Sequence, residues 1–141
     1  MNSKWYIPAR SAKAPLTVEV TPASAGWSES SLFVAELTAG ESLSWTTGRD
    51  EIIVVPLSGS ASVTSDGEKF ELTGRASVFD GPSDFVYVGR DSTFTLATAD
   101  GGRFALCGAR AGKKLPFRYV PAADVAVELR GAGNCLSLIH I

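Results

Sequence analysis

The side chains that could perform catalysis in this chain are few, and they set narrow limits on its chemistry. There is one histidine, His140, next to the last of the 141 residues. A catalytic divalent metal needs three or four convergent nitrogen or oxygen ligands, and a serine or cysteine nucleophile needs a base that takes its proton. One histidine beside the terminus meets neither need. The sequence therefore predicts neither a catalytic metal nor a histidine-activated nucleophile in this chain.

Paired carboxylates are the next candidates for chemistry. Asp50, Glu51 and Asp80 could face one another across strands, and burial could raise the pKa of one of them enough for acid or base work. Ordinary turn chemistry is favoured instead. We expect Asp50 to cap the turn after Gly48, and Asp80 to take part in the turn that it begins with Gly81.

Arg75 has two open roles. It follows Gly74 and precedes an apolar segment, and its guanidinium fork suits a carboxylate. It could brace two sheets through a buried ion pair with Glu51 or Asp80, or it could bind the carboxylate of a substrate. Bracing is favoured, with Glu51 and Asp80 as its structural partners, and Arg75 is kept as the candidate for substrate binding.

The bulk composition excludes several classes of protein. Hydrophobic residues make up 45% of the chain and charged residues 20%, with a net charge of −2, which is typical of a globular domain. The basic residues are scattered, so nucleic acid is not expected as a partner. No apolar run has the length of a signal peptide or of a membrane span, so no membrane is expected either. Cys107 and Cys135 lack metal-type spacing, and a reducing cytoplasm is the default location.

The pattern along the chain predicts short strands between turn residues. The expected strands are 32–37, 52–57, 61–64, 69–72, 84–88, 92–97 and 103–106. Asp66-Gly67 between two of them is the strongest short-range signal for a hairpin. Residues 52–57 are a continuous apolar run, which is typical of a strand covered on both faces, and Pro56 in it indicates a bulge or an edge position. Because no helical periodicity persists, the fold class is all-β, as a single sandwich or jelly-roll domain.

The end of the chain is less regular. We expect a domain at 1–135 that closes with an extended arm at about 115–135, because prolines at 116 and 121 block a regular ladder. Residues 125–129 could be a last strand or the start of a connection. Residues 131–134 are expected to be a flexible exit.

Two blocks carry a resemblance to a known family. Residues 51–59 (EIIVVPLSG) and 74–82 (GRASVFDGP) are similar to the amino-terminal half of the 5-deoxy-glucuronate isomerase family, in the cupin superfamily. The segments 4–8 and 115–119 and the pair Gly26-Trp27 also fit. The resemblance runs from about residue 3 to about residue 135, and the second block is its most specific part.

The resemblance implies a cupin-like jelly roll, the first of two cupins in a protein about twice this length. The implied reaction is the aldose–ketose isomerisation of 5-deoxy-D-glucuronate to 2-deoxy-5-keto-D-gluconate, a step of myo-inositol catabolism in the cytoplasm. The implied partners are the small sugar-acid substrate and the carboxy-terminal cupin, and a homo-oligomer is left open. The divalent metal is expected in the carboxy-terminal cupin.

Unlike a catalytic cupin, this half lacks the side chains that bind the metal. Ser44, Thr46 and Gly48 stand near the places where a catalytic cupin has histidines, and only Glu51 stands in the acidic place. Hydroxyl groups do not replace imidazoles at a catalytic divalent site. We therefore expect no cofactor and no catalytic residue in this chain, and no activity from it alone.

Residues 136–141 do not resemble the family's continuation. They match the translation of a sequencing-library adapter, and we expect a non-native tail rather than a genuine apolar strand. Two other functions stay open: a half of the bicupin ketol-isomerase of pectin breakdown, and a single non-catalytic cupin that serves as a binding or assembly module.

Overall fold

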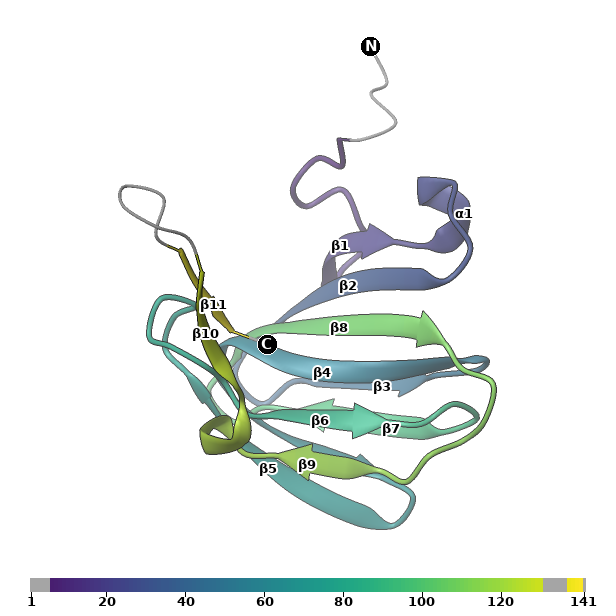
Figure 1. Cartoon of the computed structure of the whole chain (residues 1–141). Helices are drawn as coiled ribbons and strands as arrows, with labels where there is room; N and C mark the ends of the chain where they lie inside the picture. Colours follow the sequence, from purple (N-terminus) through teal and green to yellow (C-terminus); the bar gives the residue numbers. More distant parts are fainter. Residues whose placement is uncertain (1–5, 131–136, 141) are drawn as a thin grey trace.

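The computed structural model describes residues 6–130 and 137–140, and it is built almost entirely of strands (Figure 1). The elements, in chain order, are β1 (Leu16–Val20), α1 (Pro22–Ala25), β2 (Ser30–Leu37), β3 (Ser42–Thr46), β4 (Asp50–Ser65), β5 (Glu68–Arg75), β6 (Phe85–Val88), β7 (Thr93–Ala97), β8 (Gly102–Arg110), β9 (Arg118–Val120), a 3-10 turn (Ala122–Asp124), β10 (Val127–Arg130) and β11 (Ser137–His140). Among the described residues, no helix has the length and apolar character needed to cross a membrane.

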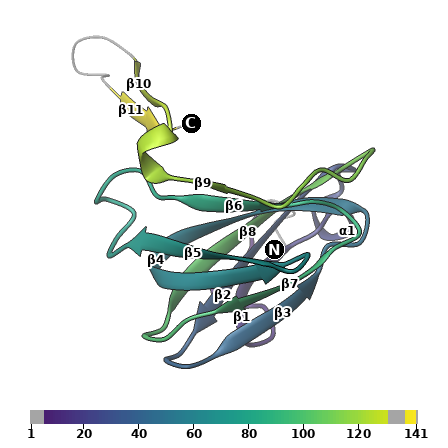
Figure 2. The ribbon, with the colours of Figure 1, turned by 90° about the horizontal axis from the view of Figure 1, so that it is seen from below.

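Within the described residues, nine strands form one antiparallel sheet that folds into two layers. The layer that we call the front layer has the order β1-β2-β8-β4-β6-β9. In the back layer β3 pairs with β7, β7 with β4, and β4 with β5. Figure 2 shows β6 and β9 on one side of the molecule and β3 and β7 on the other. The predicted all-β, cupin-like jelly-roll sandwich is confirmed.

One long strand, β4, belongs to both layers. Its first part, to Gly59, pairs with β8 in the front layer, and its last part, 61–65, pairs with β5 and β7 in the back layer. The register shifts twice at the crossing, between Pro56 and Ser58 and between Gly59 and Ala61. Since bulges bend a strand and increase its twist, these two irregularities let one strand turn from one layer to the other. The bulge predicted at Pro56 is confirmed.

The core lies between the layers. Alternate residues of each strand point into it, as the period of two in a strand requires. Its buried members are Phe33, Ala35, Leu37, Ile52, Val54, Ala61, Val63, Leu72, Val86, Val88, Phe94, Leu96, Phe104, Leu106 and Phe117. The outward residues Ile53 and Val55 stay partly exposed, so the prediction of a strand covered on both faces was wrong for the described chain.

The hairpin predicted at Asp66-Gly67 is present between β4 and β5. Both residues have positive φ, 51° and 81°, as the tight hairpin turn with two left-handed residues requires. The expected arm is more regular than predicted, because Arg118–Val120 pairs with β6 as an edge strand and its two prolines only flank it. The predicted exit at 131–134 lies outside the described residues.

Residues 127–130 form a strand, β10, in agreement with the strand alternative, and the start of an interdomain connection here stays a prediction. β10 pairs with β11, and Figure 2 shows this hairpin projecting beyond β9. β11 covers most of the segment predicted to be a non-native tail, and the origin of that segment stays a prediction.

Glycines make the crossing of β4 sterically possible. Gly59 and Gly74 both have positive φ, 87° and 66°, which side chains of L-residues rarely adopt. A Cβ at Gly74 would overlap the carbonyl oxygen of Gly59, and a Cβ at Gly59 would lie 2.5 Å from the carbonyl oxygen of Gly101. At this corner the backbones of Gly59 and Gly74 therefore touch, with no room for a methyl group.

We expect Gly74→Ala to lower the free energy of unfolding by about 3 kcal/mol, since it adds backbone strain and a steric overlap at once. Denaturant unfolding followed by tryptophan fluorescence would measure it. Gly40→Ala is the matched control, because Gly40 has φ 78° with open space around its Cβ position, and it should cost only about 1 kcal/mol. Equal losses in the two variants would contradict the overlap.

Candidate functional site

Arg75 lies at the corner where β4 changes layers. Its Nε donates a hydrogen bond to the carbonyl oxygen of Pro56 at 3.1 Å, and its Nη1 donates to the carbonyl oxygen of Gly81 at 2.5 Å. The first acceptor sits at the bulge of β4, and the second sits in the loop between β5 and β6. The guanidinium therefore joins the bulge to the loop, and its partners are backbone groups.

The ion pairs expected for Arg75 with Glu51 or Asp80 are not present among the described residues, which corrects that prediction. Asp80 Oδ2 instead accepts from the backbone N–H of Ser77 at 2.7 Å, within a turn of the loop. Glu51 Oε2 accepts from the hydroxyl of Tyr87 at 2.7 Å, on the outer side of the front layer. The three side chains singled out from the sequence do not converge on one site. The role of Arg75 in substrate binding stays a prediction.

The pKa of Tyr87 is raised to about 12. Burial of the phenol is the largest cause, followed by its hydrogen bond to Glu51 and the charge of that carboxylate. Each of these favours the neutral phenol over the phenolate. Tyr87 is thus a firm hydrogen-bond donor at neutral pH and cannot act there as a base.

A buried carboxylate, that of Asp84, also lies at this corner, and the sequence patterns did not single it out. Asp84 is only 2% exposed. Its two oxygens accept from the backbone N–H groups of Thr73 at 2.7 Å and Gly74 at 3.0 Å, and from the hydroxyls of Tyr119 at 3.0 Å and Ser83 at 3.3 Å. A buried carboxylate is tolerated only when it is saturated with donors, and Asp84 has four.

The hydrogen bond to Asp84 also affects Tyr119. Burial first, and then this hydrogen bond and the charge of Asp84, raise the pKa of the Tyr119 phenol. Tyr119 lies on β9, so the carboxylate ties the arm to the end of β5. Asp84 thereby joins three segments that are far apart in the sequence.

The interior of the sandwich is packed with aromatic rings. The centroids of Phe33 and Trp45 are 4.7 Å apart, and those of Phe70 and Phe117 are 4.8 Å apart. Ser44 and Thr46 are exposed on the outside of β3, with the partly buried Trp45 between them. Residues of this kind do not fit a divalent metal, which needs convergent nitrogen or oxygen donors. Over 6–130 and 137–140, no three His, Cys, Asp or Glu side chains gather.

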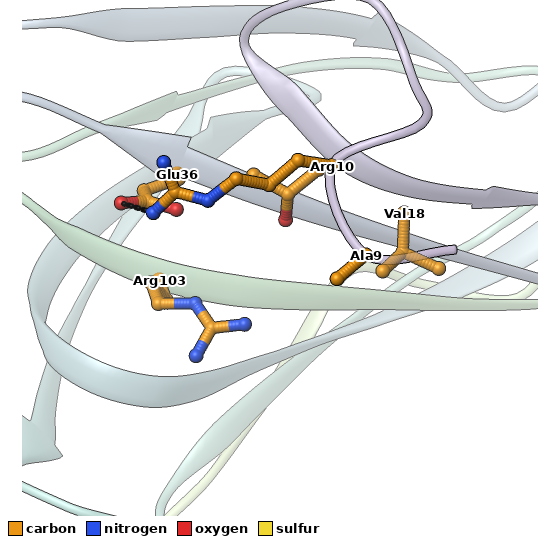
Figure 3. A pocket seen from close by; sticks show the side chains of 6 residues that line it. Ala9, Arg10, Val18, Glu36 and Arg103 are labelled. Atoms are coloured by element: carbon orange, nitrogen blue, oxygen red, sulfur yellow. Dashed lines mark ion pairs between the residues drawn. The ribbon is translucent and has the colours of Figure 1, made fainter. Parts of the chain in front are cut away.

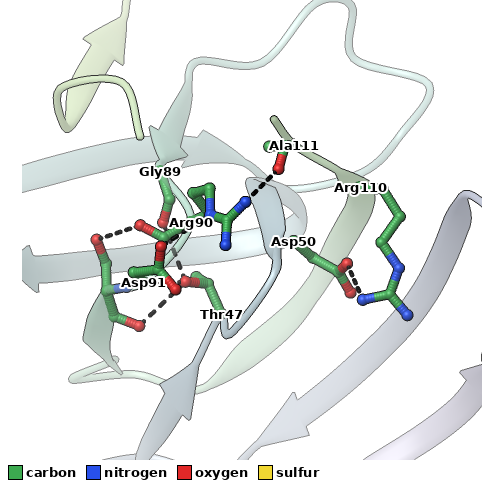
Figure 4. Close-up of polar contacts among 8 residues, drawn as sticks. Thr47, Asp50, Gly89, Arg90, Asp91, Arg110 and Ala111 are labelled. Carbon is green, nitrogen blue, oxygen red and sulfur yellow. Dashed lines mark hydrogen bonds and ion pairs between the residues drawn. The ribbon is translucent and has the colours of Figure 1, made fainter. Parts of the chain in front are cut away.

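Polar groups at one end of the sandwich are paired with each other (Figure 4). Asp50 forms an ion pair with Arg110 at 2.7 Å, and it closes the turn around Gly48 through its backbone N–H, which donates to the carbonyl oxygen of Thr47 at 3.1 Å. Arg90 pairs with Asp91 at 2.8 Å and donates to the carbonyl oxygen of Ala111 at 2.7 Å. These contacts connect loops to the sheet. They also pair the charged groups of Asp50, Arg110, Arg90 and Asp91 with one another.

The open pockets lie on the outside of the layers. A pocket of about 230 Å³ next to β1 and β2 contains an ion pair of 3.6 Å between Arg10 and Glu36 (Figure 3). A larger and mostly apolar pocket of about 460 Å³ is lined by Tyr87, Leu115, Pro116, Phe117, Arg118 and Val120. Neither of these two pockets brings together an acid, a base and a polar anchor.

Comparison with known proteins places this chain beside one family. The model of the KduI/IolB family matches residues 5–140. Relatives named 5-deoxy-glucuronate isomerase are 35% identical over 127 residues in Halalkalibacterium halodurans, 36% over 125 in Geobacillus thermodenitrificans and 32% over 127 in Bacillus subtilis strain 168. The matches cover 87–89% of this chain and 46–47% of those proteins. The chain thus spans about half the length of the curated relatives it matches.

Solved structures agree with the fold. An IolB-like protein from Salmonella typhimurium LT2 superposes with a TM-score of 0.88 at 27% identity, over 94% of this chain and 51% of that one. A cupin protein from Bacteroides fragilis gives a TM-score of 0.56 at 22% identity, over 82% of this chain and 93% of that one. The second match supports the fold alone.

We expect Asp84→Asn to lower the free energy of unfolding by about 3 kcal/mol, because an amide keeps one acceptor oxygen and turns its NH₂ toward a buried N–H donor. Tyr119→Phe, which removes one of the four donors, should cost about 1 kcal/mol. Chemical denaturation measures both. Asp100→Asn, at an exposed position, is the control and should change little. A loss below 1 kcal/mol for Asp84→Asn would contradict the stabilising role.

Arg75→Lys should lower the melting temperature. A lysine ammonium lacks the planar guanidinium fork, so it cannot donate to the carbonyl oxygens of Pro56 and Gly81 at the same time. The expected cost is about 1–2 kcal/mol. Arg49→Lys, at an exposed position whose side chain makes no hydrogen bond among the described residues, is the control. An unchanged melting temperature for Arg75→Lys would show that the two hydrogen bonds of Arg75 do not stabilise the fold.

Proposed function

This chain belongs to the KduI/IolB family, and we propose that it forms the amino-terminal half of a 5-deoxy-glucuronate isomerase that does not bind the metal. The observation that carries the proposal is the combination of the shared name of the relatives with the share of their length that the chain spans. The substrate would be a small sugar acid, 5-deoxy-D-glucuronate, and the setting would be myo-inositol catabolism in the cytoplasm.

The carboxy-terminal half of the protein would catalyse the reaction. Isomerisation of an aldose to a ketose moves a proton between adjacent carbons, so it needs an acid or base placed at those carbons. The apolar interior around Phe33 and Trp45 supports a structural role for this half, since the buried side chains of this core are all apolar. The second half would supply the divalent metal and the groups that move the proton, and this half would complete the fold.

The names of the relatives favour this substrate over the uronate of pectin breakdown. The block 74–82, which carries the resemblance, forms the end of β5 and the loop held by Arg75. The corner explains the contacts of Arg75, Ser77 and Asp80 within the block. The block supports membership of the family, and a substrate contact by Arg75 stays a prediction.

The test is an isomerase assay of the purified 141-residue chain on 5-deoxy-D-glucuronate, with and without added divalent metals. We expect no turnover in either condition, because the described residues hold no cluster of metal ligands. The full-length Bacillus subtilis isomerase, assayed in parallel, is the positive control. Turnover by the 141-residue chain would contradict the proposal that the other half supplies the metal and the catalytic groups.

Sequencing of the gene beyond codon 141 separates the isomerase half from a single non-catalytic cupin. An open frame that continues into a second cupin with histidines supports the proposal. A stop codon followed by unrelated DNA supports the binding or assembly module and would remove the isomerase from consideration.

A further inference from the structure

The outer face of the front layer carries a row of four side chains that we call the apolar band. The register places Leu32 on β2 beside Cys107 on β8, Cys107 beside Ile53 on β4, and Ile53 beside Tyr87 on β6. Leu32 is 38% exposed, Cys107 is exposed, and Ile53 and Tyr87 are only partly buried. The described chain therefore leaves the band incompletely covered.

The open apolar surface widens toward β6 and β9. Val34 and Ala105, which lie two residues from the band on β2 and β8, are already buried. On the other side, the apolar pocket of about 460 Å³ shares Tyr87 with the band, and Leu115 in that pocket is 41% exposed. The band and the pocket thus form one contiguous apolar surface, which is typical of a sheet face that another layer covers.

A positive charge follows the band on β9. Arg118 pairs with Tyr87 in the register, so it points outward as Tyr87 does, and it is exposed. Within residues 6–130 and 137–140, its guanidinium forms no ion pair and no hydrogen bond. Glu51, the carboxylate that reaches this row, already accepts the hydroxyl hydrogen bond of Tyr87. A matching partner is therefore apolar opposite the band and acidic opposite Arg118.

The chain leaves the sandwich beside this surface. β9 is the edge strand of the front layer, and the 3-10 turn and β10 follow it directly. Figure 2 shows β10 rising from the side of the sandwich that carries β6 and β9, away from β3 and β7. The chain spans about half the length of the relatives it matches, so those proteins have room for a second domain of this size. A domain that followed β10 would begin next to the apolar surface.

We propose that the carboxy-terminal half of the longer protein packs on the apolar band and the adjoining pocket, with an acidic side chain opposite Arg118. This inference rests on the proposed function, which calls for that half. A domain tethered through a short connection meets such a face at an effective concentration of about a millimolar, whereas a second copy has only its bulk concentration. A second copy that used the same face would also bring another Arg118 and the engaged Glu51. Tethering and charge both favour the attached half.

Alkylation of Cys107 tests the docking face without a substitution in it. The samples are the 141-residue chain and the whole protein encoded by the natural gene. Iodoacetamide should modify Cys107 about tenfold more slowly in the whole protein, because the thiol, exposed in the shorter chain, is then buried between the halves. Peptide mass analysis separates this thiol from Cys135. Equal rates in the two samples would overturn the docking face.

A thiol on the back layer is the matched control. Thr95→Cys, on the exposed side of β7, should react at the same rate in both proteins. Slowing of both thiols alike would show general protection and would contradict the assignment of this face.

Reversal of the charge of Arg118 tests the acidic group. Arg118→Glu should speed the alkylation of Cys107 in the whole protein about threefold, because two like charges then meet at the interface. Arg49→Glu, the same reversal at an exposed position of a turn, should leave the rate unchanged. An unchanged rate for Arg118→Glu would overturn the acidic group opposite Arg118.

The outcomes separate this inference from the proposed function. A natural gene without a second cupin would overturn the proposed function and the attached partner together. A whole protein that isomerises the sugar acid, but leaves Cys107 as reactive as in the 141-residue chain, would overturn the docking face alone. Protection of Cys107 that is present in the 141-residue chain itself and is lost on dilution would show that a second copy covers the band.

Discussion

The crossing of β4 from one layer to the other is the constraint on which the rest of the structure depends. A strand that serves two sheets must bend sharply, and the bend leaves its backbone out of register at two points. Polar groups at such a bend have to find partners other than a regular ladder, because a buried backbone group without one is costly. Arg75 and Asp84 supply those partners, one as a donor of two hydrogen bonds and the other as an acceptor of four.

The same crossing accounts for the distribution of apolar side chains. β4 lies at the middle of the front layer, where its inward residues meet the core and its outward residues meet the apolar band. Aromatic rings from both layers then fill the space between them. The interior is used for packing, and the surfaces available for recognition lie outside the sandwich.

The strand pattern made most of the fold predictable. Alternation within 61–64 and 69–72 and the Asp66-Gly67 turn gave a correct hairpin, since both signals are local. The edge strand β9 was missed, because proline positions suggest a break and only the neighbouring strand β6 shows that 118–120 can pair. At the corner, Arg75 was expected to brace two sheets through an ion pair, but its partners are carbonyl oxygens, which every residue carries and no pattern marks. Asp84 was placed only as the first residue of the expected strand 84–88, because nothing in the local sequence shows which donors its carboxylate meets after folding.

The sequence by itself determined the all-β class, the short strands, the bulge at Pro56 and the lack of histidine for a metal site, because each follows from residue type or from a spacing of a few residues. Only the tertiary structure decided which groups Arg75 holds, that Asp84 is buried under four donors, and that outward residues of four strands join into one apolar band. Apart from the hydrogen bond between the neighbours Ser83 and Asp84, these features depend on contacts between residues 6 to 75 positions apart, and most such contacts exist only once the layers have packed. Residue types and short spacings therefore predict the strands and turns of this domain, and the packing of its layers decides which side chains contact one another.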